Sequence, residues 1–384
     1  MANAILIPGK EKRVYGGHPW VFRSDIARVE GDFTPGDIVS VYSSKGKFLA
    51  KAFYNPQSQI SLRIMSLHDE PIDRAFIFRR VKEAVDYRRT FADLRSCRLI
   101  FAESDRLPAL IVDSFGDVLV LQCLALGMER FKQDVVDALV EEVHPQGIYE
   151  RSDVPVRRLE GLEQLTGVMY GTVPDRVEMV ENGVHFWVDV KEGQKTGFFL
   201  DQKENRAAIA PFVKDKTVLD CFTHTGSFAL NAAKGGAEHV TAVDVSESAI
   251  EMARANAARN GLEDKMDFLA ADVFDLLPQL EAAHEKPYDF IILDPPAYGR
   301  GANGEKWILE ENICEMLACC AQLLEPQGAF LVLNLYSMGL SSTLARTAVR
   351  QAFGAPLEEQ YGELCFTDRA GKQLPLGTYY RFIR

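Results

Sequence analysis

Strands and helices alternate regularly between residues 217 and 335, and this alternation constrains the fold more than any other feature of the sequence. Short runs rich in Val, Ile and Leu are separated by stretches in which apolar residues recur with helical spacing. Such a succession is typical of a doubly wound, mostly parallel sheet in an α/β domain. We therefore predict five strands with helices between them, at 217–220, 239–244, 266–270, 288–293 and 329–335.

The first 183 residues show different patterns. Up to residue 68, short apolar runs are broken by turn residues such as Gly16–Gly17 and Pro35–Gly36–Asp37, which is typical of a small β-barrel. A helical pattern over Ile72–Phe91, with Asp73 as its candidate cap, then precedes several strands and a second helix, Phe131–Val143. We therefore predict a barrel at residues 1–68, a central α+β domain at 69–183 and the alternating α/β domain at 184–384.

Charge and cysteine content limit the location and partners of the chain. Its net charge of −12 argues against indiscriminate binding to nucleic acid. Residues 1–67 nevertheless contain nine basic and five acidic side chains, so we expect a cationic end on an acidic protein. Seven cysteines without a Cys-x-x-Cys pair favour a reducing cytoplasm and predict neither a disulfide framework nor a metal. We expect neither secretion nor membrane insertion, because no apolar run is long enough to span a bilayer.

The first strand of the α/β region ends at Asp220 and leads through a tight turn into a helix that begins near Ser227. Parallel sheets bind nucleotides at this position. A pyrophosphate site would need glycines in the turn, but Phe222 and His224 stand where a G-x-G would be and only Gly226 remains. S-Adenosylmethionine has no phosphate, and Asp220 can pair with its ammonium while the amides of the turn receive its carboxylate. The sequence thus favours S-adenosylmethionine over a dinucleotide.

Two further acids end the next two strands. Asp244 is placed to accept the ribose hydroxyls, and Asp272 to accept the adenine amino group. Each acid could instead cap the helix that follows it, but three acids at successive strand ends form one rim. We predict that the following residues bind the cofactor: Asp220, Phe222, Thr225, Gly226, Asp244, Val245, Asp272, Val273 and Asp294.

The fourth strand ends in the segment Asp294–Pro295–Pro296–Ala297–Tyr298. Because prolines lack N–H groups and fix the turn, Asp294 and the nearby carbonyls should face whatever lies beside the methyl donor. We predict that Asp294, Pro295 and Tyr298 are catalytic, with Asp294 orienting the acceptor and Tyr298 offering a stacking face. The glycine-rich segment Tyr298–Trp307 is either a mobile loop over the acceptor or an ordinary surface loop.

Cations interleaved with an aromatic residue near the N-terminus suit phosphate contact combined with base stacking. The residues predicted to bind RNA are Lys10, Lys12, Arg13, His18, Trp20 and Arg23. Two of them have an alternative interpretation, because Trp20 can also serve the hydrophobic core and His18 a turn.

The chain resembles, nearly end to end, the bacterial rRNA large-subunit (cytosine-C5) methyltransferases, in which a PUA domain and a central α/β domain precede a Rossmann-like class I methyltransferase domain. The likeness is carried by the segments Pro8–Arg13, Gly17–Phe22, Tyr54–Ile60 and Gly197–Arg206. The resemblance implies an RNA-binding barrel, a 23S rRNA substrate and S-adenosylmethionine as the cofactor. It also implies that Gln202, Asn205 and Arg206 lie beside the cofactor.

The resemblance further implies carbon 5 of cytosine as the methylated atom, a chemistry that needs a cysteine thiolate. In such relatives the cysteine follows the fifth strand, whereas this chain reads Leu333–Met338 without one. Direct transfer to a nitrogen or oxygen, oriented by Asp294, is therefore the alternative chemistry. Two other functions stay open at this point. One is a methyltransferase of a small molecule or protein whose barrel forms a homodimer surface, and the other is a non-catalytic RNA-binding assembly factor.

Overall fold

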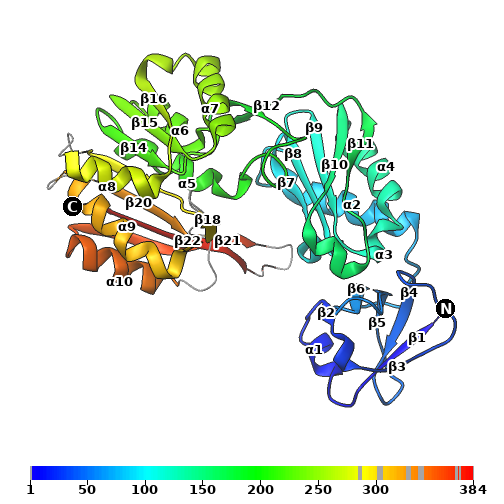
Figure 1. Ribbon diagram of the computed structural model, residues 1–384. Helices are drawn as coiled ribbons and strands as arrows, with labels where there is room; N and C mark the ends of the chain where they lie inside the picture. Colours follow the sequence, from blue (N-terminus) through cyan, green and yellow to red (C-terminus); the bar gives the residue numbers. More distant parts are fainter. Residues whose placement is uncertain are drawn as a thin grey trace. The chain divides into compact units, whose positions relative to one another are not determined.

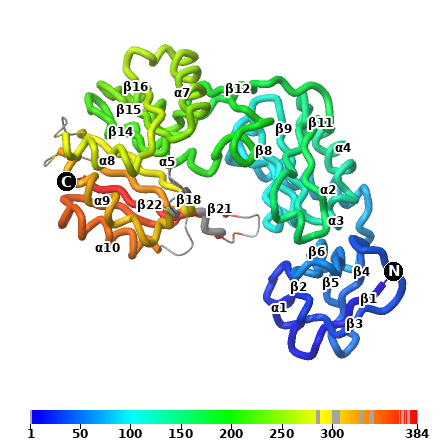
Figure 2. Tube along the Cα trace, viewed as in Figure 1, coloured from blue at the N-terminus to red at the C-terminus, as the bar shows by residue number. Residues whose placement is uncertain are grey.

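The computed structural model describes residues 2–283, 288–300, 306–325, 330–335, 341–367, 371 and 373–383. The chain forms two compact units, the first made of Met1–Met179 and Val188–Leu200 and the second of Val180–Trp187 and Asp201–Arg384. Figure 1 labels most helices and strands of each unit, and Figure 2 traces the chain from blue at the N-terminus to red at the C-terminus. Within the described ranges, no helix combines the length and the apolar character that a membrane span requires.

The first unit begins with a six-stranded sheet in the order β2-β6-β5-β4-β1-β3, in which only β1 and β4 run parallel. Its elements are β1 (Asn3–Leu6), α1 (Glu11–Tyr15), β2 (Trp20–Val21), β3 (Ile26–Glu30), β4 (Ile38–Tyr42), β5 (Phe48–Tyr54) and β6 (Leu62–Ser66). Val39 and Val41 of β4 are fully buried in its core, together with Ala50 and Ala52 of β5. Alternate residues of β1 and β4 point to this core, as expected for strands that are covered on one face.

A second sheet of the first unit has the order β11-β10-β9-β8-β7, with β9 and β10 parallel and the other pairs antiparallel. Its strands are β7 (Ser96–Phe101), β8 (Leu110–Phe115), β9 (Val118–Cys123), β10 (Gly147–Ser152) and β11 (Leu165–Gly171), and its helices are α2 (Arg74–Arg89), α3 (Leu126–Glu129) and α4 (Lys132–Val143). Asp73 caps α2 as predicted, because its side chain accepts a hydrogen bond from Phe76 N at 2.9 Å. The edge strands β7 and β11 were not predicted, and the mostly exposed β11 has no apolar alternation that would reveal it.

The second unit contains a seven-stranded sheet in the order β16-β15-β14-β17-β20-β22-β21. Its strands are β14 (Thr217–Cys221), β15 (His239–Asp244), β16 (Met266–Ala270), β17 (Phe290–Leu293), β20 (Phe330–Leu335), β21 (Glu358–Thr367) and β22 (Gln373–Ile383). The first five in this order are parallel, which confirms the predicted α/β sheet, whereas β22 runs antiparallel to both neighbours. The order reverses between β14 and β17, so their carboxyl ends flank the topological switch point at which such sheets bind ligands.

The remaining elements of the second unit are helices and two short hairpins. The helices are α5 (Lys203–Ala207), α6 (Ser227–Lys234), α7 (Glu247–Asn260), α8 (Val273–Ala283), α9 (Leu309–Leu323) and α10 (Ser342–Phe353). The hairpins pair β12 (Val177–Glu181) with β13 (Val184–Val188), and β18 (Tyr298–Arg300) with β19 (Lys306–Ile308). Strand β12 begins in the first unit and ends in the second.

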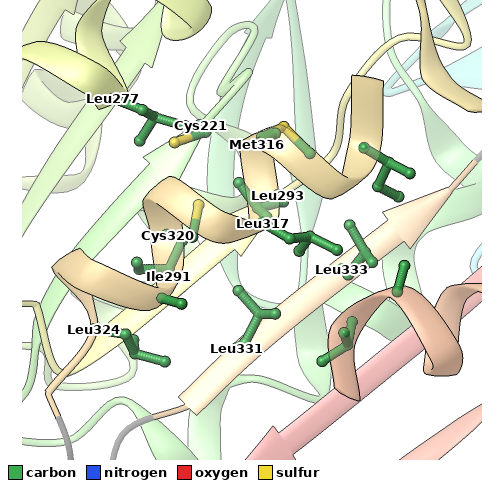
Figure 3. Close-up of a cluster of buried hydrophobic side chains, with 14 of the residues drawn as sticks. Cys221, Leu277, Ile291, Leu293, Met316, Leu317, Cys320, Leu324, Leu331 and Leu333 are labelled. Atoms are coloured by element: carbon green, nitrogen blue, oxygen red, sulfur yellow. The ribbon is translucent and has the colours of Figure 1, made fainter. Parts of the chain in front are cut away.

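Helices α8, α9 and α10 cover one face of the seven-stranded sheet through a large apolar cluster. Figure 3 shows Leu317 and Cys320 of α9 over Leu293 and Leu331 of the adjacent strands β17 and β20, with Cys221 of β14 nearby. Side chains of a strand alternate between its two faces. The residues between these apolar positions therefore point to the opposite face of the sheet. Among them are Asp220 of β14 and Asn334 of β20.

Candidate active site

Three of the predicted acids lie at the carboxyl edge of the parallel strands. Asp220 pairs in register with Ala242 of β15, and Asp244 pairs with Ala270 of β16. Asp272 follows β16 by two residues. The sequence prediction that these acids share one edge of the sheet is therefore confirmed, and what each of them binds stays a prediction.

Asp220 is buried, with 1% of its surface exposed. Its Oδ2 accepts hydrogen bonds from Thr223 Oγ1 at 2.5 Å and from Ala229 N at 2.9 Å. Its Oδ1 is buried as well but has no hydrogen-bond partner among the described residues. Burial raises the pKa of Asp220 from its usual 3.8 to about 7, and repulsion from Asp294 and Asp244 acts in the same direction. The unsatisfied oxygen fits the ammonium of S-adenosylmethionine, which would supply the missing donor.

The turn after β14 has the backbone of a glycine-rich nucleotide turn. Phe222, His224 and Gly226 have φ angles of 65°, 52° and 84°, all in the left-handed region. This conformation costs a non-glycine residue roughly 1–2 kcal/mol, and strain of this kind clusters at functional sites. A side chain at Gly226 would be crowded as well as strained by the positive φ, because its Cβ would lie 3.1 Å from Leu230 Cδ1 and from Ala253 Cβ. The turn therefore keeps its shape although two of its residues carry large side chains.

Asp244 links this turn to the end of β15. Its Oδ2 accepts a hydrogen bond from His224 N at 2.8 Å, and its Oδ1 accepts one from Ser246 N at 2.9 Å. Burial lowers the pKa of the His224 imidazole, and nearby Arg206 lowers it further although Asp244 opposes the shift. The imidazole is therefore neutral at physiological pH, and the turn carries no positive charge of its own.

Asp272 directly precedes helix α8, and its Oδ1 accepts a hydrogen bond from Phe274 N in the first turn of the helix at 2.9 Å. It also lines a cavity of about 200 Å³ together with residues of α8 and α9 and the indole of Trp307. Phe274 stacks on Trp307 with ring centroids 3.8 Å apart at one wall of this cavity. The helix-cap interpretation and the ligand interpretation of Asp272 are compatible, because the cap uses Oδ1 and the side chain still borders open space.

The two valines of the predicted cofactor set differ in their surroundings. Val245, just after β15, is 65% exposed, whereas Val273 is 2% exposed and belongs to the apolar cluster under α9. An exposed branched side chain at a strand end offers an apolar wall to a flat ring. Val245 can serve the cofactor directly, while Val273 anchors the start of α8.

Gln202, Asn205 and Arg206 lie in and just before α5, and all three are at most 5% exposed. Arg206 forms a bidentate ion pair with Glu181 of β12, with Nε–Oε1 and Nη2–Oε2 distances of 2.6 and 2.9 Å. Asn205 Nδ2 donates to Gln202 Oε1 at 2.8 Å. The guanidinium of Arg206 is thus neutralised by a partner that the sequence reasoning missed, and it ties α5 to the β12–β13 hairpin.

Two buried or half-buried asparagines of α7 also support the site and were not predicted. Asn256 donates from Nδ2 to Thr225 O at 3.0 Å, and its Oδ1 accepts from Trp187 N at 2.7 Å. Asn260 bonds both backbone groups of His185, at 2.9 Å from its N and 2.7 Å from its O. These amides connect the cofactor turn to β13. Their sequence signal was weak, because a polar residue on a helix normally indicates a solvated face.

On the acceptor side, Asp294 is half-buried, Pro295 is buried and Tyr298 is 75% exposed. The carbonyl of Pro296 accepts a hydrogen bond from Trp307 Nε1 at 2.8 Å, which joins the two ends of the glycine-rich segment. Residues 301–305 of that segment lie outside the described residues, so the predicted loop over the acceptor stays a prediction. The segment after β20, Tyr336–Leu340, also lies outside them.

None of the seven cysteines is disulfide-bonded, and all seven are described. Burial raises the pKa of the Cys123, Cys221 and Cys320 thiols. The pKa of the Cys319 thiol is also raised, first by burial and then by Glu281. A nucleophilic cysteine needs the opposite shift, because the thiolate is the reactive species. The cysteine next to the site, Cys221, points into the apolar cluster and serves as packing.

The cations predicted to bind RNA lie around α1 in the first unit. Lys10 and Arg13 pair with the buried Asp25, at 2.7 and 3.3 Å, and both remain largely exposed. Lys12 is exposed, and Arg23 donates to Pro56 O. The sequence reasoning missed Tyr15, which is 56% exposed and has Lys47 Nζ 5.0 Å from its ring centroid.

Trp20 is half-buried, and its indole N–H donates to Glu103 Oε1 at 2.7 Å. Arg63 donates to the same carboxylate at 3.0 Å and lies over the indole at 5.6 Å. His18 bonds the Trp20 backbone N–H through its Nδ1 at 3.1 Å. These contacts favour the structural interpretation of Trp20 and His18, so the cations and Tyr15 carry the RNA prediction.

Comparison with known protein families gives a match for an N-terminal and a C-terminal part of the chain. Residues 4–67 match the PUA-like domain family, and residues 162–361 match the S-adenosylmethionine-dependent methyltransferase family. The ribosomal RNA large subunit methyltransferase I of Aeromonas salmonicida is 38% identical over 98% of this chain and 95% of its own length. The protein of the same name from Vibrio vulnificus is 42% identical over 86% of this chain and 85% of its own length.

The fold has a solved counterpart. The crystal structure of SMU.776 complexed with SAH aligns over the full length of both chains, with a TM-score of 0.81 and 20% sequence identity. At this identity the likeness concerns the fold.

Proposed function

Because this chain belongs to the ribosomal RNA large subunit methyltransferase I family and is an S-adenosylmethionine-dependent methyltransferase, we propose that it methylates a base of 23S rRNA. The PUA-like match and the rRNA-methyltransferase relatives support the RNA part of this proposal. The proposal keeps the division into residues 1–68, 69–183 and 184–384, in which the first part docks RNA and the last part transfers the methyl group. It also places the reaction in the cytoplasm, in keeping with seven free cysteines.

The observation that carries the RNA assignment is the exposed cationic and aromatic surface at α1. Lys12 and Arg13 lie on the same short helix as Tyr15, which is 56% exposed and has Lys47 Nζ 5.0 Å from its ring centroid. Cations that contact phosphate beside an aromatic that stacks on a base are typical of single-stranded RNA sites. The net charge of −12 favours a local contact of this kind over an extended one.

The chemistry that fits the described site best is direct transfer to a base nitrogen. S-Adenosylmethionine, when bound, supplies a methyl group on a positively charged sulfur. Asp220 and Asp244 would hold its amino-acid and ribose ends, while the half-buried Asp294 would accept a hydrogen bond from the target base and then its proton. The shifts of the buried thiols away from the thiolate form support nitrogen over carbon 5 as the acceptor.

Charge reversal at α1 tests the RNA assignment. The variant Lys12→Glu/Arg13→Glu should bind an rRNA fragment more weakly, and the slope of log K against log salt should fall by about 2 if each side chain contacts one phosphate. The matched control is Lys82→Glu/Arg95→Glu, which reverses two exposed cations elsewhere in the same unit. Equal affinities of both double variants and the wild type would contradict the RNA-docking role.

The same variants address the rival assignment, in which the barrel is a homodimer surface of a small-molecule or protein methyltransferase. Under that alternative, Lys12→Glu/Arg13→Glu would change the molar mass measured by light scattering and leave RNA binding unaffected. Our proposal expects the reverse result.

A further inference from the structure

Asn334 is a buried polar residue next to the proposed acceptor site, and neither the sequence reasoning nor the comparisons assigned it a role. It lies near the carboxyl end of β20 and has no exposed surface. Leu293 of β17 pairs in register with Leu333 of β20, so Asn334 is level with Asp294, the residue that directly follows β17. Leu333 and Leu335 face the cluster under α9, so Asn334 points to the opposite face, as Asp220 does between Leu219 and Cys221.

The hydrogen bonds around Asn334 determine which way its amide points. Arg381 of β22 has only donors, so the Asn205 atom 2.6 Å from its Nη2 must be the oxygen, Oδ1. The other atom of that amide, Nδ2, is then a donor, and it lies 2.9 Å from Asn334. Asn334 must meet this donor with its own oxygen. The chain of bonds from Arg381 through Asn205 therefore turns the NH₂ group of Asn334 away from α5.

No residue that the structure describes is a partner of that NH₂ group. Asn334 Nδ2 is buried, and among the described residues no acceptor lies within hydrogen-bond distance of it. Buried donors without a partner are rare in folded proteins, since each forfeits its bond to water. Its neighbour Asn205 is fully used, with one acceptor and two donor contacts. Arg381 Nε is also buried without a described partner, but of these two open donors it is Asn334 Nδ2 that lies beside Asp294.

The position of Asn334 in the sheet favours the acceptor base over the cofactor as its ligand. The three acids assigned to the cofactor lie at the carboxyl ends of β14 and β15 and just after β16, on one side of the switch point. Asn334 lies on β20, on the other side of the switch point and beyond β17. Strand β20 is two strand spacings, or roughly 10 Å, from β14. Asp294 stands between them and offers an acceptor, while Asn334 offers a donor.

We propose that Asn334 is a specificity-determining residue whose Nδ2 donates a hydrogen bond to the target nucleobase. The atom of the base that accepts this hydrogen bond is a carbonyl oxygen or an unprotonated ring nitrogen. It lies next to the N–H group of the base that donates a hydrogen bond to Asp294. Arg381 and Asn205 are positioning residues, because they act only by holding the Asn334 amide in this orientation. This inference rests on the proposed function, since it takes an RNA base as the acceptor.

The test compares Asn334→Asp and Asn334→Ala with the wild type in the full-length protein. Each is given methyl-labelled S-adenosylmethionine and total RNA from a strain that lacks the gene, and the labelled RNA is separated by size. Both variants should bind S-adenosylhomocysteine within about twofold of wild type by calorimetry. Transfer into RNA at neutral pH should fall about 10- to 100-fold, the loss expected for one buried hydrogen bond.

The pH profile separates hydrogen-bond donation from a merely structural role. In Asn334→Asp the carboxyl still accepts from Asn205, and it regains a donor only when protonated. The transfer rate of this variant relative to wild type should therefore rise as the pH is lowered, whereas the ratio for Asn334→Ala should stay flat. Asn182→Asp, which changes an exposed asparagine in the turn between β12 and β13, serves as the control for amide-to-acid exchange in this domain.

Undiminished RNA labelling by both Asn334 variants, with wild-type protein active, would overturn this inference and leave the proposed function intact. Loss of S-adenosylhomocysteine binding in proportion to the loss of transfer would also overturn it, because Asn334 would then serve the cofactor. Absence of label in any RNA with the wild-type protein would overturn the proposed function and this inference with it.

Discussion

Replacing Asp220 by asparagine should make the protein more stable at neutral pH and weaken its binding of the cofactor. The folded-state pKa of Asp220 is about 7, against 3.8 without the protein environment. The folded state therefore binds more protons than the unfolded state between about pH 4 and pH 7. The free energy of unfolding of the wild type therefore falls as the pH rises through this window. Above about pH 7 the decrease caused by Asp220 is complete.

The magnitude follows from the size of the shift. About three pKa units at about 1.4 kcal/mol each amount to a cost of about 4 kcal/mol for the ionised carboxylate. Asparagine keeps an oxygen for Thr223 Oγ1 and Ala229 N and never ionises. Asp220→Asn should consequently match the wild type near pH 4 and exceed its free energy of unfolding by about 4 kcal/mol at pH 8.

Urea unfolding of both proteins at pH 4.5 and pH 8 measures this difference, and other titrating groups cancel in the comparison. Calorimetry with S-adenosylhomocysteine provides the second readout. The affinity of the wild type for this ligand should increase between pH 5.5 and pH 7.5, because the ammonium of the ligand pairs with the ionised carboxylate. The Asp220→Asn variant should bind the ligand at least about 10-fold more weakly, and its affinity should not depend on this titration. A stability difference that is the same at both pH values would refute the reasoning.

Three further substitutions probe the rim, the acceptor side and the hairpin support. Asp244→Ala should retain its circular dichroism spectrum but bind S-adenosylhomocysteine at least about 10-fold more weakly, and unchanged calorimetric affinity would remove Asp244 from the site. Asp294→Ala should bind S-adenosylhomocysteine normally but transfer about 100-fold or more slowly, which undiminished turnover would contradict. Glu181→Gln should lower the free energy of unfolding by about 3–5 kcal/mol, because it removes the carboxylate charge that neutralises buried Arg206, and a loss below about 1 kcal/mol in urea would show that the ion pair is dispensable.

The sequence was sufficient to predict the parallel sheet and the shared edge of Asp220, Asp244 and Asp272. Both depend on local patterns, because buried parallel strands are continuous apolar runs and their carboxyl ends fall at one edge. The antiparallel pair β21 and β22 was not predicted. Nothing local indicates that these strands extend a sheet whose other members lie far away in the sequence.

The open donor of Asn334 could not be inferred from the sequence for a related reason. It exists only because Arg381 orients Asn205 and Asn205 orients Asn334, and these three residues come from β22, α5 and β20. Likewise, Trp20 has the interleaved pattern of an RNA-binding aromatic, but its indole bonds a carboxylate 83 residues away. Hydrogen bonds between side chains that lie far apart in the sequence leave no periodic pattern of residues from which they could be predicted.

The most direct test of the account is nucleoside mass spectrometry of 23S and 16S rRNA from cells that lack this gene, cells complemented with the wild type and cells complemented with Asp294→Ala. We predict that one N-methylated nucleoside is missing from 23S rRNA without the gene, returns with the wild type and stays missing with the variant. A missing 5-methylcytidine would contradict the nitrogen acceptor, and identical rRNA nucleosides in all strains would contradict rRNA methylation itself.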